Sequence, residues 1–189
     1  MERCGWCLGF QAYIDYHDTE WGVPNHSDKV HFEFLVLESA QAGLSWSTIL
    51  KKRDGYRRLF ADFDPVQVAQ FDEATIQALK TDASIIRNEA KIRAAVNNAR
   101  LFLEIQQEFG SFDTFIWSFV NHQPIDGALR SMGEARATSP ESDALSKVLK
   151  KRGFKFLGST VMYAHMQAMG LYNDHLSTCF RYREVKALQ

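Results

Sequence analysis

The segment from Phe34 to Trp46 places an acidic residue where a helix should face the core. Four apolar residues, Phe34 to Leu37, lead directly into Glu38, and glutamate is rarely buried without a partner. Glu38 is therefore a candidate functional carboxylate, either for proton transfer or for binding a polar or charged ligand. Taken alone, a glutamate on a helix is more often a solvated residue of the polar face.

A second set of reactive side chains lies at the two ends of the chain. Cys4 and His17 are near the N-terminus, and His175 and Cys179 are near the C-terminus. The i, i+4 spacing predicts that His175 and Cys179 share a helical face and hold two corners of a tetrahedral Zn²⁺ site, which Cys4 and His17 complete. Two alternatives stay open: a CxxC redox pair of Cys4 and Cys7, without the βαβ pattern it needs, or buried apolar cysteines.

A third pattern combines cations with the start of a helix. Five basic residues fall within nine positions: Lys147, Lys150, Lys151, Arg152 and Lys155. They precede Gly158 and the pair Ser159-Thr160, which can cap a following helix whose free backbone amides favour an anion. A nucleic-acid phosphate suits such a site. A solvated cationic helix end explains the charge equally well.

Capping residues and apolar spacing indicate which elements position these groups. They predict helices over 28–42, 46–60 with an interruption at 54–55, a short one from 65, and then 72–79, 87–109, 112–121, 140–152 and 159–169. Residues 1–26 are irregular or short-helical, and 123–140 form a long loop of the kind that is often functional. No stretch alternates apolar and polar residues, so the sequence predicts an all-α fold without a sheet.

Composition narrows the protein class. A chain of 189 residues with 46% hydrophobic and 13% aromatic residues fits one folded domain over residues 1–189. The net charge of -1 gives no global preference for nucleic acid, so such a partner must be recognised by a local patch. No leader-like or membrane-length apolar run occurs, which favours a cytoplasmic protein without a membrane partner. Nothing in the sequence requires more than a monomer.

Several separated motifs run through nearly the whole chain, the 123–140 loop excepted. They are ERCGW, YHDTEWGVP from Tyr16, LESAQAGLSW with TILKKR, FDP from Phe63, WSFVNHQP from Trp117, SDALSKVLKKRGFKFLGST and NDH from Asn173. Together they resemble the 3-methyladenine DNA glycosylase I family. The resemblance implies an all-α helix-hairpin-helix enzyme of the bacterial cytosol. It would hydrolyse the N-glycosidic bond of 3-methyladenine in alkylated double-stranded DNA, release the free base and leave an abasic site, the first step of base excision repair.

The resemblance also implies how the base is bound. Tyr16 and Trp46 match residues that stack on the extruded base, which is a cationic purine when N3 is alkylated. Glu38 matches the carboxylate that hydrogen-bonds the purine edge, so its role is recognition and charge stabilisation more than proton transfer. Tyr13, Trp6 and Trp21 are further candidate pocket walls, with an ordinary core role as the alternative for each.

For DNA binding, the resemblance assigns two turns. Gly43-Leu44 match a turn that enters the minor groove and fills the gap left by the extruded base. The hairpin element falls at 145–169, where Lys155, Gly158, Ser159 and Thr160 would contact phosphates. Phe156 departs from the usual pattern, because a glycine is expected at its position. With Lys155 facing phosphate and forming no Schiff base, we expect a monofunctional enzyme without strand cleavage.

The remaining assignments concern zinc and water activation. Matching positions make Cys4, His17, His175 and Cys179 the ligands of a structural zinc, carried by segments 1–26 and 171–189, and leave Cys7 outside the set. Asp174 is a candidate for activating water, but it lies close after Gly158 and directly before a ligand, so we favour Glu38. The competing interpretation of the whole chain is a noncatalytic, zinc-stabilised helical module that binds damaged DNA.

Overall fold

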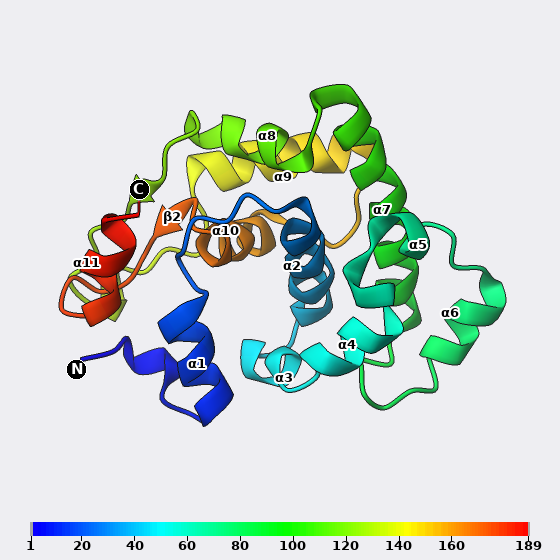
Figure 1. Cartoon of the computed structure of the whole chain (residues 1–189), viewed down its shortest axis with the longest axis horizontal. Coiled ribbons are helices and arrows are strands. Elements are labelled where there is room, and N and C mark those ends of the chain that lie inside the picture. The colour runs from blue at the N-terminus through cyan, green and yellow to red at the C-terminus, as the bar shows by residue number, and fades with distance from the viewer. Residues whose placement is uncertain (1, 189) are drawn as a thin grey trace.

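The computed structural model describes residues 2–188, and helices dominate it (Figure 1). The helices are η1 (Gly5–Cys7), α1 (Gln11–Thr19), α2 (Asp28–Gln41), α3 (Trp46–Leu50), α4 (Arg53–Leu59), η2 (Ala61–Phe63), α5 (Pro65–Val68), α6 (Glu73–Leu79), α7 (Glu89–Phe109), α8 (Phe112–Trp117), η3 (Ser118–Val120), η4 (Met132–Glu134), α9 (Pro140–Arg152), α10 (Ser159–Ala168) and α11 (Phe180–Lys186). Two short strands, β1 (Ile125–Asp126) and β2 (Tyr172–Asn173), complete the set.

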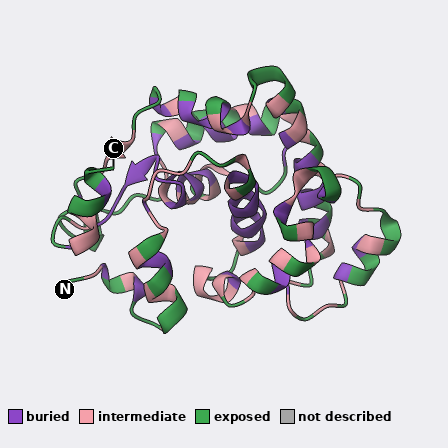
Figure 2. Ribbon diagram, in the orientation of Figure 1, coloured by how far each residue is buried: buried purple, intermediate pink, exposed green. Residues whose placement is uncertain are grey.

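Helix α2 passes through the middle of the molecule, and every residue from His31 to Ala40 is buried (Figures 1 and 2). It contacts α3, α7, α8 and α10. A helix enclosed on all sides needs apolar residues around its whole circumference, which the run ending at Leu37 supplies. The expectation that Glu38 faces the interior is confirmed, since only 4% of its surface is exposed.

Local capping signals account for most helix boundaries. At the start of six helices, α3 and α5 to α9, the side chain of the N-cap residue accepts a hydrogen bond from a backbone N–H of the first turn. These N-cap residues are Ser45, Asp64, Asp72, Asn88, Ser111 and Ser139. Gly110 and Gly153 follow α7 and α9 with positive φ, as glycine permits. One expected cap is wrong: Gly158 is the N-cap of α10, and Ser159 already lies in its first turn.

The expected interruption of the 46–60 helix lies elsewhere. The break between α3 and α4 falls at Lys51 and Lys52, and Asp54 and Gly55 are inside α4. Gly55 serves packing instead of a turn, because a Cβ there would lie 2.3 Å from the carbonyl oxygen of Ser84. A close approach of two backbones is invisible to a pattern of neighbouring residues, and the glycine was therefore misinterpreted.

The prediction that the fold contains no sheet is also wrong in detail. Strands β1 and β2 pair in parallel, with Ile125 opposite Tyr172 and Asp126 opposite Asn173. Two-residue strands are too short to show alternation, so no pattern in the sequence indicates them. Their pairing brings the 123–140 loop beside the C-terminal segment. In the same region, the amide of Phe180 donates to the carbonyl of Glu2, so both chain ends lie on one side (Figure 1). Within residues 2–188, no helix combines the length and the hydropathy needed to cross a bilayer.

Two glycines with positive φ separate backbone strain from steric clash. Gly110 has φ +85° and free space around a Cβ, whereas a Cβ on Gly170, with φ +74°, would lie 2.3 Å from the nitrogen of Pro24. We expect Gly110→Ala to lower the free energy of unfolding by about 1 kcal/mol. Gly170→Ala should lower it by about 2 kcal/mol more, because the clash adds to the strain. Denaturant unfolding measures both; equal losses would contradict the clash.

Candidate active site and metal cluster

A cavity of about 270 Å³ opens beside α2. Its walls come from η1, α1, α2, α3, α10, the 123–140 loop and the end of β2. The lining residues are Trp6, Tyr13, Tyr16, Trp21, Glu38, Gln41, Trp46, Leu129, Met132, Ala135, Arg136, Ala164, Gln167 and Asp174. The fold thus brings together all six residues that the sequence proposed for the base pocket. Their individual roles stay predictions.

Aromatic rings form the walls of this cavity. The rings of Tyr16 and Trp46 have centroids 5.4 Å apart, and those of Trp6 and Trp21 are 4.9 Å apart in an edge-to-face arrangement. The Nε1–H of Trp46 is buried and has no hydrogen-bond partner among the described residues. Electron-rich ring faces around a slot suit a flat and positively charged ring system.

The carboxyl group of Glu38 is a cavity group whose protonation state at neutral pH differs from that of an ordinary glutamate. No side-chain hydrogen bond reaches it from residues 2–188, and burial raises its pKa to about 8. Because desolvation is the cause, the protonated form predominates at neutral pH while the cavity holds no cation. A cation against the carboxyl would reverse this preference. The sequence-based expectation of a standing negative charge therefore changes into a charge that forms when a cation binds.

A second carboxylate, Asp174, also lines the cavity and is 5% exposed. Its Oδ2 accepts hydrogen bonds from the hydroxyl of Tyr163 at 2.6 Å and from Nε2 of Gln167 at 2.7 Å. Desolvation and this hydrogen bond raise the pKa of Tyr163. The short spacing from Gly158 argued against Asp174 in the sequence, yet the turn after β2 brings it into the cavity.

The metal-ligating side chains predicted from the two chain ends also meet. Cys4, His17, His175 and Cys179 are all buried, and their ligand atoms lie within 4.8 Å of one another. The Sγ of Cys179 is 3.5 Å from Nε2 of His17 and 3.8 Å from Nδ1 of His175. The Sγ of Cys4 is also 3.8 Å from that Nδ1. This cluster could hold a metal ion.

The secondary structure of this cluster differs from the expectation. His175 and Cys179 lie in the turn between β2 and α11, and Cys179 is only the N-cap of α11. The i, i+4 pair therefore does not share a helical face. Cys7 lies outside the cluster, as expected, and its thiol donates to the carbonyl of Cys4.

Each histidine of the cluster is oriented through its second ring nitrogen. Nδ1 of His17 is 2.8 Å from a carboxylate oxygen of Asp18, and Nε2 of His175 is 2.9 Å from the carbonyl oxygen of Trp21. Such partners fix the tautomer that leaves the other nitrogen free as a ligand. Trp21 also lines the cavity, so the cluster packs directly behind one of its walls.

Comparisons with known proteins agree over nearly the full chain. A family model described as methyladenine glycosylase matches residues 6–182. DNA-3-methyladenine glycosylase 1 of Escherichia coli strain K12 is 52% identical over 182 residues, which is 96% of this chain and 97% of the relative. The chain belongs to the methyladenine glycosylase family. DNA-3-methyladenine glycosylase of Haemophilus influenzae is 46% identical over 177 residues, 94% of this chain and 96% of that relative.

A solved structure supports the same assignment at the level of the backbone. The structure of 3-methyladenine DNA glycosylase I from Staphylococcus aureus, determined for the basis of 3-methyladenine recognition, has a TM-score of 0.92 and 40% identity. The match covers 95% of this chain and 96% of that chain. The fold of this family member is therefore that of a solved relative.

Two exposed turns flank the pocket-forming helices of this glycosylase-family chain. Gly43 has φ +79° and presents Leu44, which is 42% exposed. Between α9 and α10, Phe156 has φ +58° and is 41% exposed. A bulky residue in the left-handed region is strained. The turn thus adopts a conformation that glycine favours while carrying a phenylalanine.

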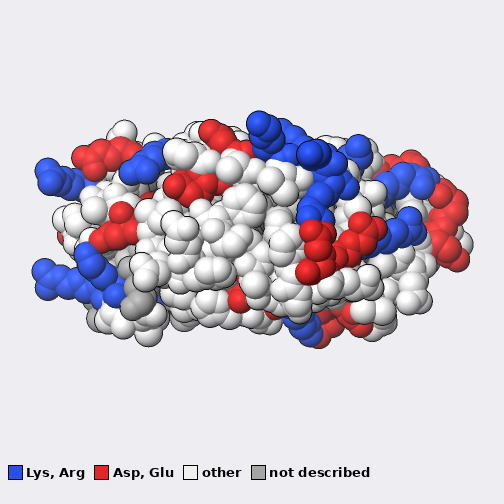
Figure 3. All heavy atoms as spheres, turned by 90° about the horizontal axis from the view of Figure 1, so that it is seen from above, with Lys and Arg blue, Asp and Glu red and all other residues white. Residues whose placement is uncertain are grey.

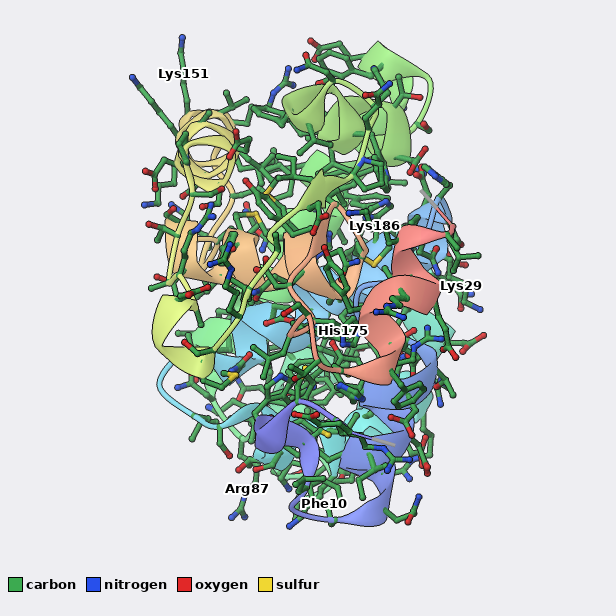
Figure 4. The ribbon with its side chains drawn as sticks, turned by 90° about the vertical axis from the view of Figure 1, so that its left-hand side faces the viewer. Phe10, Lys29, Arg87, Lys151, His175 and Lys186 are labelled. Atoms are coloured by element: carbon green, nitrogen blue, oxygen red, sulfur yellow. The ribbon has the colours of Figure 1, made fainter. Side chains whose placement is uncertain are left out.

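The polar groups near the α9–α10 turn include some that are bonded within the protein and some that extend into solvent. The hydroxyl of Ser159 donates to Asp143 and lies 3.0 Å from that of Ser142, so it holds α10 to α9. Lys151 projects from α9 into solvent, whereas His175 lies beside α11 among other side chains and is fully buried (Figure 4). Figure 3, which looks down on α8 and α9, shows basic side chains gathered in a group with acidic ones beside it. Phosphate contacts by Lys155, Gly158, Ser159 and Thr160 stay predictions.

Sequence reasoning missed several residues of the cavity wall. Gln41 lies one turn after Glu38, so the helical period already placed it on the same face. Leu129, Met132 and Arg136 come from the 123–140 loop, whose length marked it as functional but whose course the sequence did not reveal.

The raised pKa of Glu38 has a consequence for stability. Its ordinary value is 4.5 and its value in the fold is about 8, so the folded state keeps a proton that the unfolded chain loses between these pH values. The stabilising effect is complete below pH 4.5 and is lost as the pH rises through 8. We expect Glu38→Gln to gain up to a few kcal/mol over the wild type across this range. Thermal unfolding at several pH values measures it; a difference independent of pH would contradict the prediction.

Proposed function

We propose that this protein is a monofunctional DNA-3-methyladenine glycosylase. The observation that supports it best is the unpartnered carboxyl group of Glu38, buried in an aromatic-walled cavity of a methyladenine glycosylase family chain. The E. coli and H. influenzae relatives carry this activity in their names. The alignment with each relative covers nearly the whole of both chains, so the proposal does not depend on an isolated motif.

The reaction begins with extrusion of the damaged nucleotide, since the base is out of reach inside a duplex. Alkylation at N3 gives the purine of the nucleoside a formal positive charge. The rings of Tyr16 and Trp46 stack on this cation, and the Glu38 carboxyl ionises against it. A neutral purine would leave that carboxyl protonated and gain less. The cavity therefore selects alkylated bases by charge.

Hydrolysis then replaces one bond at C1′ of the sugar by another. The bond from C1′ to the purine nitrogen breaks, its electron pair neutralises the departing 3-methyladenine, and a water oxygen bonds to C1′ and loses a proton. Because the leaving group is already cationic, little acid catalysis is needed. A negative charge on Glu38 also favours the oxocarbenium-like sugar. Asp174, which lines the cavity, is a secondary candidate for activating the water, after Glu38.

Two features support hydrolysis without strand cleavage. None of the cavity-lining residues is a lysine, and Lys155 lies in the exposed turn between α9 and α10. A Schiff base with the sugar requires an amine at C1′. We assign the α9–α10 pair as a helix-hairpin-helix element that binds phosphates through its turn and the start of α10. We assign Gly43-Leu44 as the wedge that fills the gap left in the duplex by the extruded base.

Structural zinc is assigned to Cys4, His17, His175 and Cys179. Bonds of about 2.3 Å to sulfur and about 2.05 Å to nitrogen give a tetrahedral sulfur-to-nitrogen separation of about 3.6 Å. The sulfur-to-nitrogen distances found are 3.5, 3.8 and 3.8 Å. Burial, with a smaller contribution from the neighbouring Cys179 thiol, raises the pKa of the Cys4 thiol to about 12, so a thiolate there needs a cation beside it. The ion would join the chain ends and hold Trp21 in the cavity wall. It takes no part in the reaction.

The first test is release of free 3-methyladenine from methylated duplex DNA. We expect the wild type to release the base and leave abasic sites without strand breaks. Glu38→Gln should lower kcat/KM by about 10- to 100-fold, the worth of a hydrogen bond to a charged group. The kcat/KM of the wild type should rise with pH through about 8, and that of the variant should not.

Two outcomes would overturn this function. Tight binding of damaged duplex with no base release would favour the noncatalytic module. Full activity of Glu38→Gln would remove the role of the carboxyl.

The zinc assignment predicts different effects for two buried cysteines. Cys179→Ala removes a ligand and should abolish stoichiometric zinc in elemental analysis, with a loss of several kcal/mol of stability. Cys7→Ser should retain zinc, because the Cys7 thiol lies outside the cluster. Protein free of zinc, or equal metal loss in both variants, would contradict the ligand set while leaving the glycosylase activity untouched.

A further inference from the structure

Two polar side chains are buried on the otherwise apolar inner face of α7, and each reaches an exposed turn. They are Lys91 and Asn98. Burying a polar group costs free energy unless it is hydrogen-bonded. Both side chains direct their hydrogen bonds to backbone atoms of other elements.

Lys91 holds the end of α2. Its ammonium group donates to the carbonyl of Ala40 at 2.7 Å and to that of Ala42 at 2.6 Å. These carbonyls lie where a helix leaves acceptors unsatisfied, and a cation there complements the helix dipole. Ala42 directly precedes Gly43-Leu44, so the buried cation lies beneath the first exposed turn.

Asn98 holds the turn between α9 and α10. Its Nδ2 donates to the carbonyl of Lys155 at 2.9 Å, and its Oδ1 accepts from the amide of Lys155 at 2.9 Å. Both hydrogen-bonding functions of one amide therefore bind one residue of the turn. Asn97 adds a bond from its Nδ2 to the carbonyl of Gly153 at 3.1 Å. The strained conformation of Phe156 is fixed immediately beside this clamp.

The two anchors are seven residues apart on one straight element. Seven residues make nearly two complete helical turns, so the side chains leave the same face about 10.5 Å apart along the axis. An open hollow runs along α7 to the second turn. It is lined by Ala90, Arg93, Ala94, Asn97, Lys155 and Phe156.

We infer that α7 acts as a ruler, in which Lys91 and Asn98 are positioning residues that fix the separation of the two DNA-contacting turns. This inference rests on the proposed function, in which Gly43-Leu44 enters the duplex and the α9–α10 turn binds its backbone. The wedge can fill the gap at the extruded base only if the phosphate contacts hold the duplex in register. Neither anchor touches the base cavity.

The test compares Lys91→Met and Asn98→Ala with the wild type on methylated duplex DNA. Each should lower kcat/KM by about 10- to 100-fold, the effect of a misplacement of about 1 Å. The Kd for free 3-methyladenine should stay within about twofold, because the pocket is unchanged. The double variant should be little worse than the weaker single variant, since a ruler fails when either end is released.

Controls separate this role from plain destabilisation. Arg100→Ala removes a bond from α7 to the carbonyl of Ala69, which belongs to neither turn, and should leave kcat/KM unchanged. Asn98→Asp keeps the acceptor for the Lys155 amide and loses the donor, so its activity should fall between the wild type and Asn98→Ala. That series decides the matter even if Lys91→Met does not fold.

Distinct results would overturn the ruler and the function. A wild type that releases no base would refute the proposed function itself. With an active wild type, the ruler is wrong if Lys91→Met and Asn98→Ala keep duplex activity, or if their losses multiply in the double variant. Parallel loss of free-base affinity would assign both residues to the general fold instead.

Discussion

The structure depends on the burial of one ionisable group without a partner. Helix α2 is buried along its whole central stretch. The Glu38 carboxyl extends from it to the wall of the cavity, and burial raises the pKa of this group to about 8. A buried charge would be costly, so the group stays protonated until a cation compensates it. The surrounding elements then have two tasks. They must exclude water, which would solvate and ionise the Glu38 carboxyl, and they must leave an opening shaped for a flat ring.

Those tasks are performed by segments far apart in the sequence. The Cys/His cluster joins the two chain ends. Trp21 connects this cluster to the cavity, because its side chain lines the cavity and its backbone carbonyl orients His175 of the cluster. The parallel pairing of β1 with β2 brings Asp174 and the 123–140 loop together at the cavity wall. On the outer surface, α7 holds two exposed turns through Lys91 and Asn98. The rigid helical frame thus positions side chains that the chain order keeps separate.

The sequence was informative wherever the decisive interactions are local. Asp72 and Ser111 cap the helices expected of them, and the apolar run before Glu38 correctly predicted a buried helix. It failed where contacts between distant segments decide. The i, i+4 spacing of His175 and Cys179 suggested a helix, yet β2 and the N-terminal segment hold that stretch as a turn. Gly55 marked an expected break, whereas its role is contact with Ser84. The six proposed pocket residues were recoverable from family motifs and Gln41 from the helical period, but Met132 and Arg136 required the course of the 123–140 loop.

The titration of Glu38 also bears on how the site distinguishes damaged from normal purines. Binding and ionisation are linked, so a cationic base that lowers the pKa of the carboxyl is bound more tightly in the same measure. At neutral pH the first part of that shift only ionises the carboxyl. Each further unit by which the cation lowers the pKa below the ambient pH is worth about 1.4 kcal/mol of preference over a neutral base of the same shape. In the proposed function, stacking of the base on Tyr16 and Trp46 cannot supply this discrimination alone, because neutral purines also stack. A carboxyl that began fully ionised would attract cations of any kind, and one that accepted hydrogen bonds would ionise without a bound cation. In the proposed function, burial without a partner makes the ionisation of Glu38 respond to the charge of the base. With so labile a leaving group, selecting the right base would then be most of the catalysis.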